Sequence, residues 1–333
     1  MTPRIIAELA ANHGLITRKR ALELGLSDGE VADLVRRGAW RRLRRGVYVL
    51  AEVDIAAVSF ADRRRLTDRA ACLAIRREFV RSHTTAMLEL GVPILLPSRP
   101  MAHVTRNCLA TQHKYGVKHH LAPYRPGDVV GINGFAVLGH VRSAIDIARE
   151  YGHPYGVVAI DRVRWLGHSE AELAEVIETQ MKFWPDRRDA LRALEQSCPG
   201  SESVAETLGR DLVEELGVTG IETQFGLTDG RRTHFADLRL GRHLIEIDGR
   251  QKYVKDNGPT LGDIDDVILA EKQREDWFRG FHLGMSRLTW SDVWGPGRQA
   301  AKERLRRELA QTDRLWGTAI DDLERFRVRR RAA

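Results

Sequence analysis

Three carboxylates, Asp237, Glu246 and Asp248, lie close together in the segment 234–252. The alternation of apolar and polar residues around them predicts two short strands that turn at Gly241. Because side chains two apart on a strand point to the same face, Glu246 and Asp248 project together, and Asp237 can face them across the hairpin. Carboxylates gathered among apolar side chains repel one another and resist burial. A hard divalent cation such as Mg²⁺ (or Mn²⁺) would neutralise them, which predicts a metal site for phosphodiester chemistry.

The elements expected to position these carboxylates are a helix, three strands, a second helix and a last strand. The helices are expected over 202–216 and 264–279, and the strands over 222–225, 234–240, 244–248 and 282–289. This order resembles the core of PD-(D/E)XK nucleases, an α/β fold, over about residues 200–295. The resemblance is closer to the very-short-patch-repair-like branch, the DUF559 domains. It rests on Glu206, Gln224, Asp237, the run from Glu246 to Gly249, Lys252 with Tyr253, and the run from Glu271 to Glu275.

The resemblance implies roles for these residues. Asp237 and Glu246, with Asp248 as a further candidate ligand, hold the metal, which polarises the phosphoryl oxygen and lowers the pKa of a bound water. Lys252, or Lys272 on the following helix, stabilises the charge of the transition state. Glu206 is a further ligand or an orienting group. Asp248 stands where the general nuclease pattern has lysine, which leaves the water-activating base open.

Two other interpretations of the acidic residues remain. They can form a solvated face that pairs with neighbouring arginines, namely Arg239, Arg242 and Arg250. The domain can also be a nuclease-like module that binds without cleaving, because a fold does not determine a function.

The first 55 residues predict a winged helix-turn-helix. Apolar spacing favours a helix over 3–12, and Thr17 can cap a second helix over 18–24. Ser27, with Glu30 three residues later, forms the pattern of a capping box for a third helix. Two strands that turn near Gly46 complete the motif.

Charge supports a nucleic-acid partner for this segment. Residues 1–50 hold 10 Arg and Lys against 5 Asp and Glu. Several of these bases lie at the end of the third helix and in the wing, where they can contact phosphates. The candidate DNA-binding residues are Arg36, Arg37, Arg41, Arg42, Arg44 and Arg45. The alternative is a helical bundle with a solvated basic loop.

The stretch 9–50 also resembles the N-terminal domain of AbiEi-type antitoxins of type IV toxin–antitoxin systems. The resemblance rests on its G-L-I-T opening and on the L-V-R-R-G and R-R-G-V-Y sequences that close it. It implies transcriptional autoregulation through DNA binding. A cognate nucleotidyltransferase-type toxin is the partner that such a family implies.

Residues 56–196 predict an α+β middle domain that resembles the middle region of AbiEi-like proteins. An Asn133-Gly134 turn predicts a hairpin within it. The segment is rich in histidine, but His119 and His120 are adjacent and point to opposite sides of a strand, so they seldom share one ion. No metal site is expected here, because the usual ligand spacings are absent.

The whole chain predicts an α+β multidomain protein. Its 333 residues, net charge of +7 and 43% hydrophobic content suit packed domains with a polyanionic partner. The expected domains are 1–55, 56–196, 200–295 and a basic helical tail over 296–333. An odd number of scattered cysteines and no apolar run long enough to cross a membrane predict a cytoplasmic protein.

Two functions follow from these patterns. The first is a DNA-binding protein with a Mg²⁺-dependent endonuclease domain that hydrolyses phosphodiester bonds. The alternative is an AbiEi-like transcriptional regulator or antitoxin whose nuclease-like domain is inactive.

Overall fold

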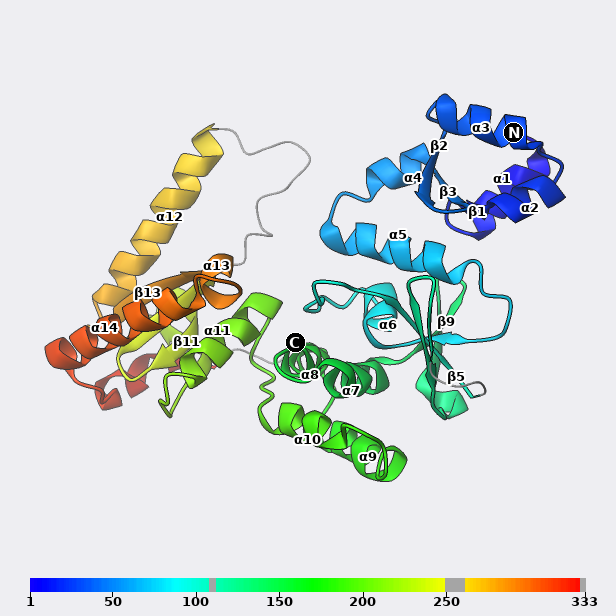
Figure 1. Ribbon diagram of the computed structural model, residues 1–333. Coiled ribbons are helices and arrows are strands. Elements are labelled where there is room, and N and C mark those ends of the chain that lie inside the picture. Colours follow the sequence, from blue (N-terminus) through cyan, green and yellow to red (C-terminus); the bar gives the residue numbers. More distant parts are fainter. Residues whose placement is uncertain (108–111, 249–260, 330–333) are drawn as a thin grey trace. The chain divides into compact units, whose positions relative to one another are not determined.

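The computed structural model describes residues 1–107, 112–248 and 261–329 (Figure 1). It has helices and three sheets, so the predicted α+β multidomain class is confirmed. The chain forms two compact units, one of Met1–Ala159 with Ala171–Leu191 and one of Ile160–Glu170 with Arg192–Ala333. The predicted domain limits stay predictions. Among the described residues, no helix is both long enough and apolar enough to cross a membrane.

The first fifty residues form three helices and a three-stranded sheet. The helices are α1 (Pro3–Ala11), α2 (Arg18–Glu23) and α3 (Asp28–Arg36), and the strands are β1 (Leu15–Thr17), β2 (Trp40–Arg44) and β3 (Val47–Leu50). β3 lies between β1 and β2 and is antiparallel to both. This order is consistent with a winged helix-turn-helix in which β2 and β3 form the wing.

Local side-chain contacts explain where these helices begin. Thr17 Oγ1 accepts the N–H of Arg20 at 3.1 Å. Ser27 Oγ accepts the N–H of Glu30 at 3.2 Å, and Glu30 Oε2 accepts the N–H of Ser27 at 2.7 Å. Both predicted caps are thus confirmed, and each satisfies backbone donors that a helix start leaves without partners. The helices then bury apolar side chains around Trp40.

The segment from residue 51 to 195 adds seven helices and six strands to the described structure. The helices are α4 (Ala51–Ala56), α5 (Phe60–Cys72), α6 (His83–Glu89), α7 (His140–Tyr151), α8 (Tyr155–Trp165), α9 (Glu170–Gln180) and α10 (Arg187–Glu195). The strands are β4 (Val80–Arg81), β5 (Ala102–Arg106), β6 (Gln112–Lys114), β7 (Val117–Leu121), β8 (Val129–Ile132) and β9 (Phe135–Leu138), which form one mixed sheet in the order β6-β7-β5-β4-β9-β8.

The hairpin of β8 and β9 has the turn that the sequence predicts. Asn133 and Gly134 take φ values of 52° and 77°. Positive φ at both central residues is the type I′ pattern, which matches the twist of the two strands. Helix α5 begins at Phe60, where Ser59 Oγ accepts the N–H of Asp62, and ends at Cys72.

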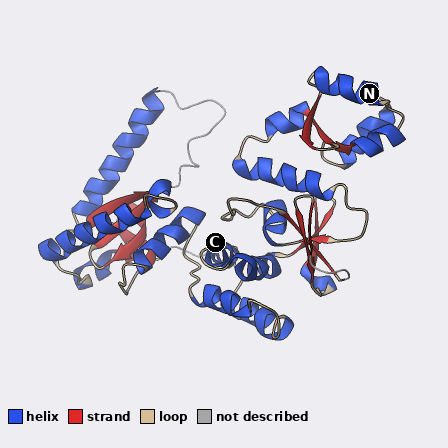
Figure 2. Ribbon diagram, in the orientation of Figure 1, coloured by secondary structure: helices blue, strands red, loops and turns tan. Residues whose placement is uncertain are grey.

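The C-terminal elements follow the predicted order of helix, three strands, helix and strand. They are α11 (Val204–Glu214), β10 (Glu222–Thr228), β11 (Thr233–Leu240), β12 (His243–Asp248), α12 (Leu261–Arg279) and β13 (Gly284–Thr289). After them come α13 (Trp290–Val293), α14 (Arg298–Trp316), a 3-10 turn (Asp321–Phe326) and β14 (Arg327–Val328). Figure 2 shows these strands as one sheet with helices packed beside it.

The sheet of the C-terminal unit has the order β13-β12-β11-β10-β14. β10, β11 and β12 are antiparallel neighbours, whereas β13 is parallel to β12 along the whole of that strand. Buried side chains from β10, β11, β12 and α12 form the core on one face, including Phe225, Leu244 and Phe278.

Several elements of the described structure were not expected from the sequence, among them β1, α8, α10 and β14. Because of β14, the segment expected to be a basic helical tail also contributes a strand. β14 pairs with β10 and forms an edge of the sheet, and α14 buries Ala301, Leu305 and Leu309. Much of the segment after residue 296 is therefore packed structure, because its apolar residues at helical spacing bury a face of α14.

Candidate functional site

Helix α11 places Glu206 beside the sheet. The helix begins at Ser203, whose Oγ accepts the N–H of Glu206 at 3.1 Å, and Glu206 Oε2 in turn accepts the N–H of Glu202 at 2.8 Å. One turn later, Gly209 lies so close to β12 that a Cβ there would be 2.5 Å from Ile247 Cδ1. Glycine at this position therefore permits the close approach that brings Glu206 towards the carboxylates of the strands.

The pairing of β11 with β12 stops at Asp237. Backbone register is present from Leu238 with Ile245 to Leu240 with His243. Beyond that point, the N–H of Ile247 donates to Asp237 Oδ2 at 2.7 Å. The carboxylate of Asp237 thus replaces the backbone carbonyl that would accept this N–H in a regular sheet. The hydrogen bond holds Asp237 between the two strands, next to Glu246.

Gln224 of β10 connects Glu206 to the strands. Its backbone has φ of 52°, an uncommon value for a residue other than glycine. Its Nε2 donates to Glu206 Oε2 at 3.1 Å. Strained backbone often persists where it serves a site, and here it accompanies a side chain that orients a carboxylate.

The three carboxylates act on one another electrostatically. Burial, with the charge of Asp237, raises the pKa of Glu206 to about 7. Burial and the same Asp237 charge also raise the pKa of Glu246 to about 7, against the opposing effect of Arg274. Near neutral pH this group therefore holds protons that a divalent cation could replace.

Arg274 of α12 is the cation that the structure places at this site. Its Nη2 donates to Glu246 Oε1 at 2.6 Å, and it also donates to the carbonyl of Phe235. The pairing of Arg274 with Glu246 was not predicted from the sequence, because no local pattern indicates which side of α12 meets β12. The guanidinium neutralises Glu246 and holds the end of β11 next to α12.

The other predicted site residues have different positions. Asp248 lies two residues beyond Glu246 on β12, beside Thr289 of β13, and its carboxylate forms no hydrogen bond or ion pair with a described residue. Lys252 lies outside the described residues, so its predicted role stays a prediction. The structure therefore brings Glu206, Asp237 and Glu246 together and adds Gln224 and Arg274 to them.

These residues fit a hard divalent cation by their chemistry. Glu206, Asp237 and Glu246 supply carboxylate oxygens, which are the ligands that Mg²⁺ and Mn²⁺ accept most readily. Their mutual repulsion and partial burial are relieved by such an ion. In the described structure, however, the oxygens of these three carboxylates do not all lie within 4.8 Å of one another.

The predicted arginines of the N-terminal segment divide into two sets. Arg36 pairs with Asp33, Arg41 Nη1 lies 2.8 Å from Asp54 Oδ2, and Arg44 donates to the carbonyl of Tyr115. Arg44 thus ties the wing to the loop between β6 and β7.

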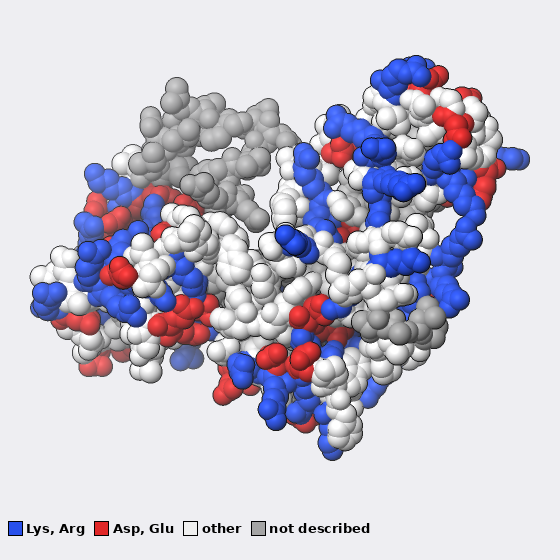
Figure 3. Space-filling view, in the orientation of Figure 1, with Lys and Arg blue, Asp and Glu red and all other residues white. Residues whose placement is uncertain are grey.

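The arginines of the second set have no acidic partner among the described residues. Arg42 and Arg45 are exposed in and beside β2 and form no ion pair with any described residue. Arg37 is exposed at the end of α3 and reaches only the carbonyl of Asp33, at 3.4 Å. In the face shown in Figure 3, blue side chains predominate over red on the N-terminal elements. Exposed guanidinium groups without acidic partners are the ones best able to contact phosphates.

The middle segment holds a cluster that the sequence analysis missed. His83, His103 and His120 bring ligand atoms within 4.8 Å of one another. The expectation of no metal site considered His120 only with its neighbour His119, which is not part of this cluster. The register of β5 and β7 places His103 and His120 on the same face of the sheet, and α6 supplies His83.

Comparison with known proteins identifies the N-terminal segment. Residues 4–51 match the family described as "Transcriptional regulator, AbiEi antitoxin". A domain of that family is therefore present at the N-terminus, and the predicted resemblance there is confirmed. No curated protein matches the chain.

Proposed function

We propose that the protein binds double-stranded DNA through α3 and the wing of β2 and β3. The match of residues 4–51 to a transcriptional regulator family carries this proposal. Helix α3 is the recognition helix, and its exposed Arg37 lies at the end of the helix. Arg42 and Arg45 of the wing neutralise phosphates beside the groove.

A gel-shift titration with a DNA fragment from the protein's own promoter tests this proposal. Replacement of Arg42 and Arg45 by glutamate reverses two charges, so we expect binding to weaken by at least about a hundredfold at low salt. A matched control replaces Arg306 and Arg307, two exposed arginines of α14, by glutamate. Equal binding by the Arg42/Arg45 variant and the wild type, or an equal loss in the control, would contradict the proposal.

The second proposal concerns the carboxylate group. We propose that Asp237 and Glu246, with Asp248 and Glu206 nearby, hold Mg²⁺ for the hydrolysis of phosphodiester bonds. It is supported by the raised pKa of Glu206 and of Glu246 beside Asp237. The order of α11, β10, β11, β12, α12 and β13, which resembles the PD-(D/E)XK core, also favours it.

The chain's own residues divide the work of such a site. The bound metal supplies Lewis acidity to the phosphoryl oxygen and to a water. Gln224 orients Glu206, and the Ile247 N–H orients Asp237. Arg274 can exchange Glu246 for an oxygen of the scissile phosphate, because a guanidinium binds both anions through similar hydrogen bonds. The winged helix delivers the duplex.

Incubation of supercoiled plasmid with the purified protein in Mg²⁺, Mn²⁺ or EDTA tests hydrolysis. We expect metal-dependent nicking that Asp237→Asn abolishes. Glu275→Gln, which alters a partly exposed carboxylate of α12 that pairs with Arg279, serves as the control and should leave nicking unchanged. Nicking that survives both EDTA and Asp237→Asn, or no nicking by the wild type in either metal, would exclude this proposal and leave DNA binding intact.

The family match favours a regulator without hydrolysis as the alternative. In that case the protein acts as an antitoxin and has a nucleotidyltransferase-type toxin as its partner. Such a toxin encoded beside this protein, and copurifying with it, would support the alternative.

A further inference from the structure

Three histidines from separate elements meet inside the middle segment of the first unit. His83 begins α6, His103 is the second residue of β5, and His120 lies in β7. β5 and β7 are parallel neighbours, with His103 opposite Lys118 and Thr105 opposite His120. His103 and His120 therefore point to the same face of the sheet, and His119 points to the other.

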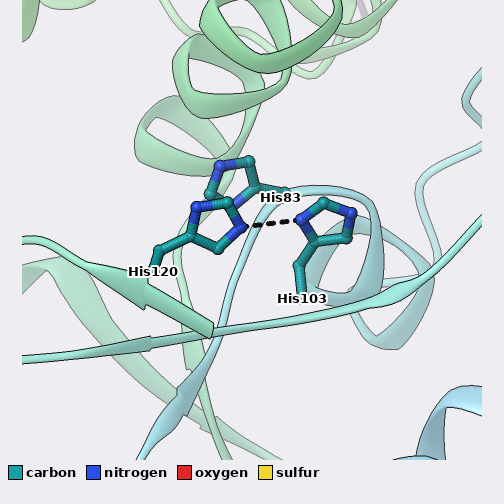
Figure 4. A group of neighbouring side chains, drawn as sticks. All are labelled: His83, His103 and His120. Carbon is teal, nitrogen blue, oxygen red and sulfur yellow. Dashed lines mark hydrogen bonds between the residues drawn. The ribbon is translucent and has the colours of Figure 1, made fainter. Parts of the chain in front are cut away.

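The rings lie close enough to share one ion. Their ligand nitrogens all lie within 4.8 Å of one another, and His103 Nδ1 is 2.9 Å from His120 Nε2 (Figure 4). The ring of His83 stacks on that of His120 with 3.9 Å between centroids. Two nitrogens of neighbouring ligands around a zinc ion lie about 3.3 Å apart, given Zn–N bonds of about 2.0 Å and tetrahedral angles. Only small movements of these rings are needed to admit the ion.

Hydroxyl groups hold two of the rings by their other nitrogens. His83 Nδ1 is 2.9 Å from Ser82 Oγ, and His103 Nε2 is 2.7 Å from the hydroxyl of Tyr151. This leaves Nε2 of His83 for a shared ligand, and His103 Nδ1 and His120 Nε2 would exchange their mutual hydrogen bond for bonds to the ion. Metal-binding histidines commonly use such outer hydrogen bonds to fix the tautomer and the direction of the ring.

The charge state of the rings suits a metal. Burial, together with the neighbouring His120, holds the pKa of His83 and of His103 well below the ordinary value, and burial lowers the pKa of His120 to about 3. Neutral imidazole is the form that binds metals. The nearby cations have their own carboxylates, since Lys118 pairs with Glu150, and Arg142 and Arg149 both pair with Asp146.

The backbone conformation of His83 is independent evidence that its ring is positioned for a ligand. This residue is buried, yet its φ is 52°. Left-handed backbone is unfavourable at a residue other than glycine or asparagine and tends to persist where a site requires it. Here it turns the ring of His83 from the start of α6 onto the rings of β5 and β7.

From these observations we infer a transition-metal site at His83, His103 and His120. Three neutral imidazoles without a thiolate suit Zn²⁺ and its neighbours Co²⁺, Ni²⁺ and Cu²⁺, rather than Mg²⁺. Three protein ligands leave a fourth position for water or a substrate atom. The ion joins α6 to the sheet, so its binding also stabilises the first unit. This site is separate in residues and in chemistry from the carboxylate group.

Metal titration of the full-length protein tests the inference. The protein is stripped with a chelator and studied in the Asp237→Asn background, which removes the proposed Mg²⁺ ligand. We expect one equivalent of Co²⁺ to bind with the visible absorption of a tetrahedral nitrogen site, and Zn²⁺ to displace it. We also expect Zn²⁺ to raise the melting temperature.

Paired histidine variants decide the location. His103→Gln and His120→Gln should lose the Co²⁺ absorption and the Zn²⁺ stabilisation, whereas His119→Gln and His113→Gln should keep both. If the ligand variants fail to fold, Tyr151→Phe replaces them, and we expect it to weaken the affinity by about 10–100-fold. No stoichiometric binding by the parent protein, or an equal loss in His119→Gln, would overturn the inference and leave the rings as a hydrogen-bonded core cluster.

Discussion

The guanidinium of Arg274 lies 2.6 Å from the carboxylate of Glu246, and the two residues are 28 positions apart. The pair joins α12 to β12 at the one point where β11 and β12 have parted. Burial and Asp237 favour the protonated form of Glu246, whereas Arg274 favours the charged form. The pair therefore determines how readily a metal ion can replace the proton of Glu246 or the guanidinium of Arg274.

The first prediction concerns Arg274 as a competitor of the metal. Arg274→Met removes a charge-assisted hydrogen bond to Glu246, which contributes about 1.5 kcal/mol, so Mg²⁺ affinity should rise about tenfold. Calorimetric titration with Mg²⁺ measures the change. Arg279→Met, on the same helix and paired with Glu275, should leave the affinity unchanged. Weaker Mg²⁺ binding by Arg274→Met would show that the arginine supports the site instead.

The second prediction concerns stability against pH in the presence of EDTA. The pKa values of Glu206 and Glu246 are raised to about 7 in the folded protein. A raised carboxyl pKa contributes stability that is present below the ordinary value and is lost as pH rises through the folded one. The wild type should therefore lose stability relative to Glu206→Gln and Glu246→Gln between pH about 5 and about 8. Urea unfolding at several pH values measures the difference, and parallel curves would contradict it.

A third prediction follows from the contact of Gly209 with Ile247. Gly209→Val places methyl groups where a Cβ alone would already lie 2.5 Å from Ile247 Cδ1. We expect it to destabilise the fold by about 1–3 kcal/mol through overpacking. In an Ile247→Ala background the added methyl groups have room, so the cost of Gly209→Val should shrink. Chemical denaturation of the four proteins measures this coupling, and additive costs would count against the close approach.

The capping box at Ser27 provides a fourth prediction. Ser27→Ala removes the acceptor for the Glu30 N–H, and we expect the free energy of unfolding to fall by about 1 kcal/mol. Because Glu30 also accepts the N–H of Ser27, the Ser27→Ala and Glu30→Ala costs should not add. Thermal unfolding of the protein, followed by a spectroscopic probe attached to α3, measures this loss of stability. Ser59→Ala, at the start of α5, is a matched cap variant that should leave α3 unaffected.

The salt dependence of DNA binding supplies a fifth prediction. Arg42→Ala should reduce the slope of log affinity against log salt by about one, because one phosphate contact is lost. Arg44→Ala should change the slope less, since the guanidinium of Arg44 is bound to the carbonyl of Tyr115. Fluorescence anisotropy at several salt concentrations gives both slopes. A larger effect from Arg44 would mean that it leaves Tyr115 when DNA binds.

Local sequence was sufficient for much of the fold. The caps at Thr17 and Ser27, the Asn133-Gly134 turn and the order of elements from α11 to β13 all depend on residues a few positions apart. The strands that hold Asp237 and Glu246 are adjacent in sequence, and a hairpin brings such strands together. For this reason the sequence alone also predicted that these two carboxylates meet.

Only the tertiary structure decided the partners that come from distant elements. Arg274 reaches Glu246 because α12 lies against the sheet, and His83, His103 and His120 meet because α6 packs on β5, the parallel neighbour of β7. Composition and spacing carry no record of which helix face packs on which strand, since many packings satisfy the same apolar pattern. Long-range packing therefore determined which charged and metal-binding groups of this protein share a site.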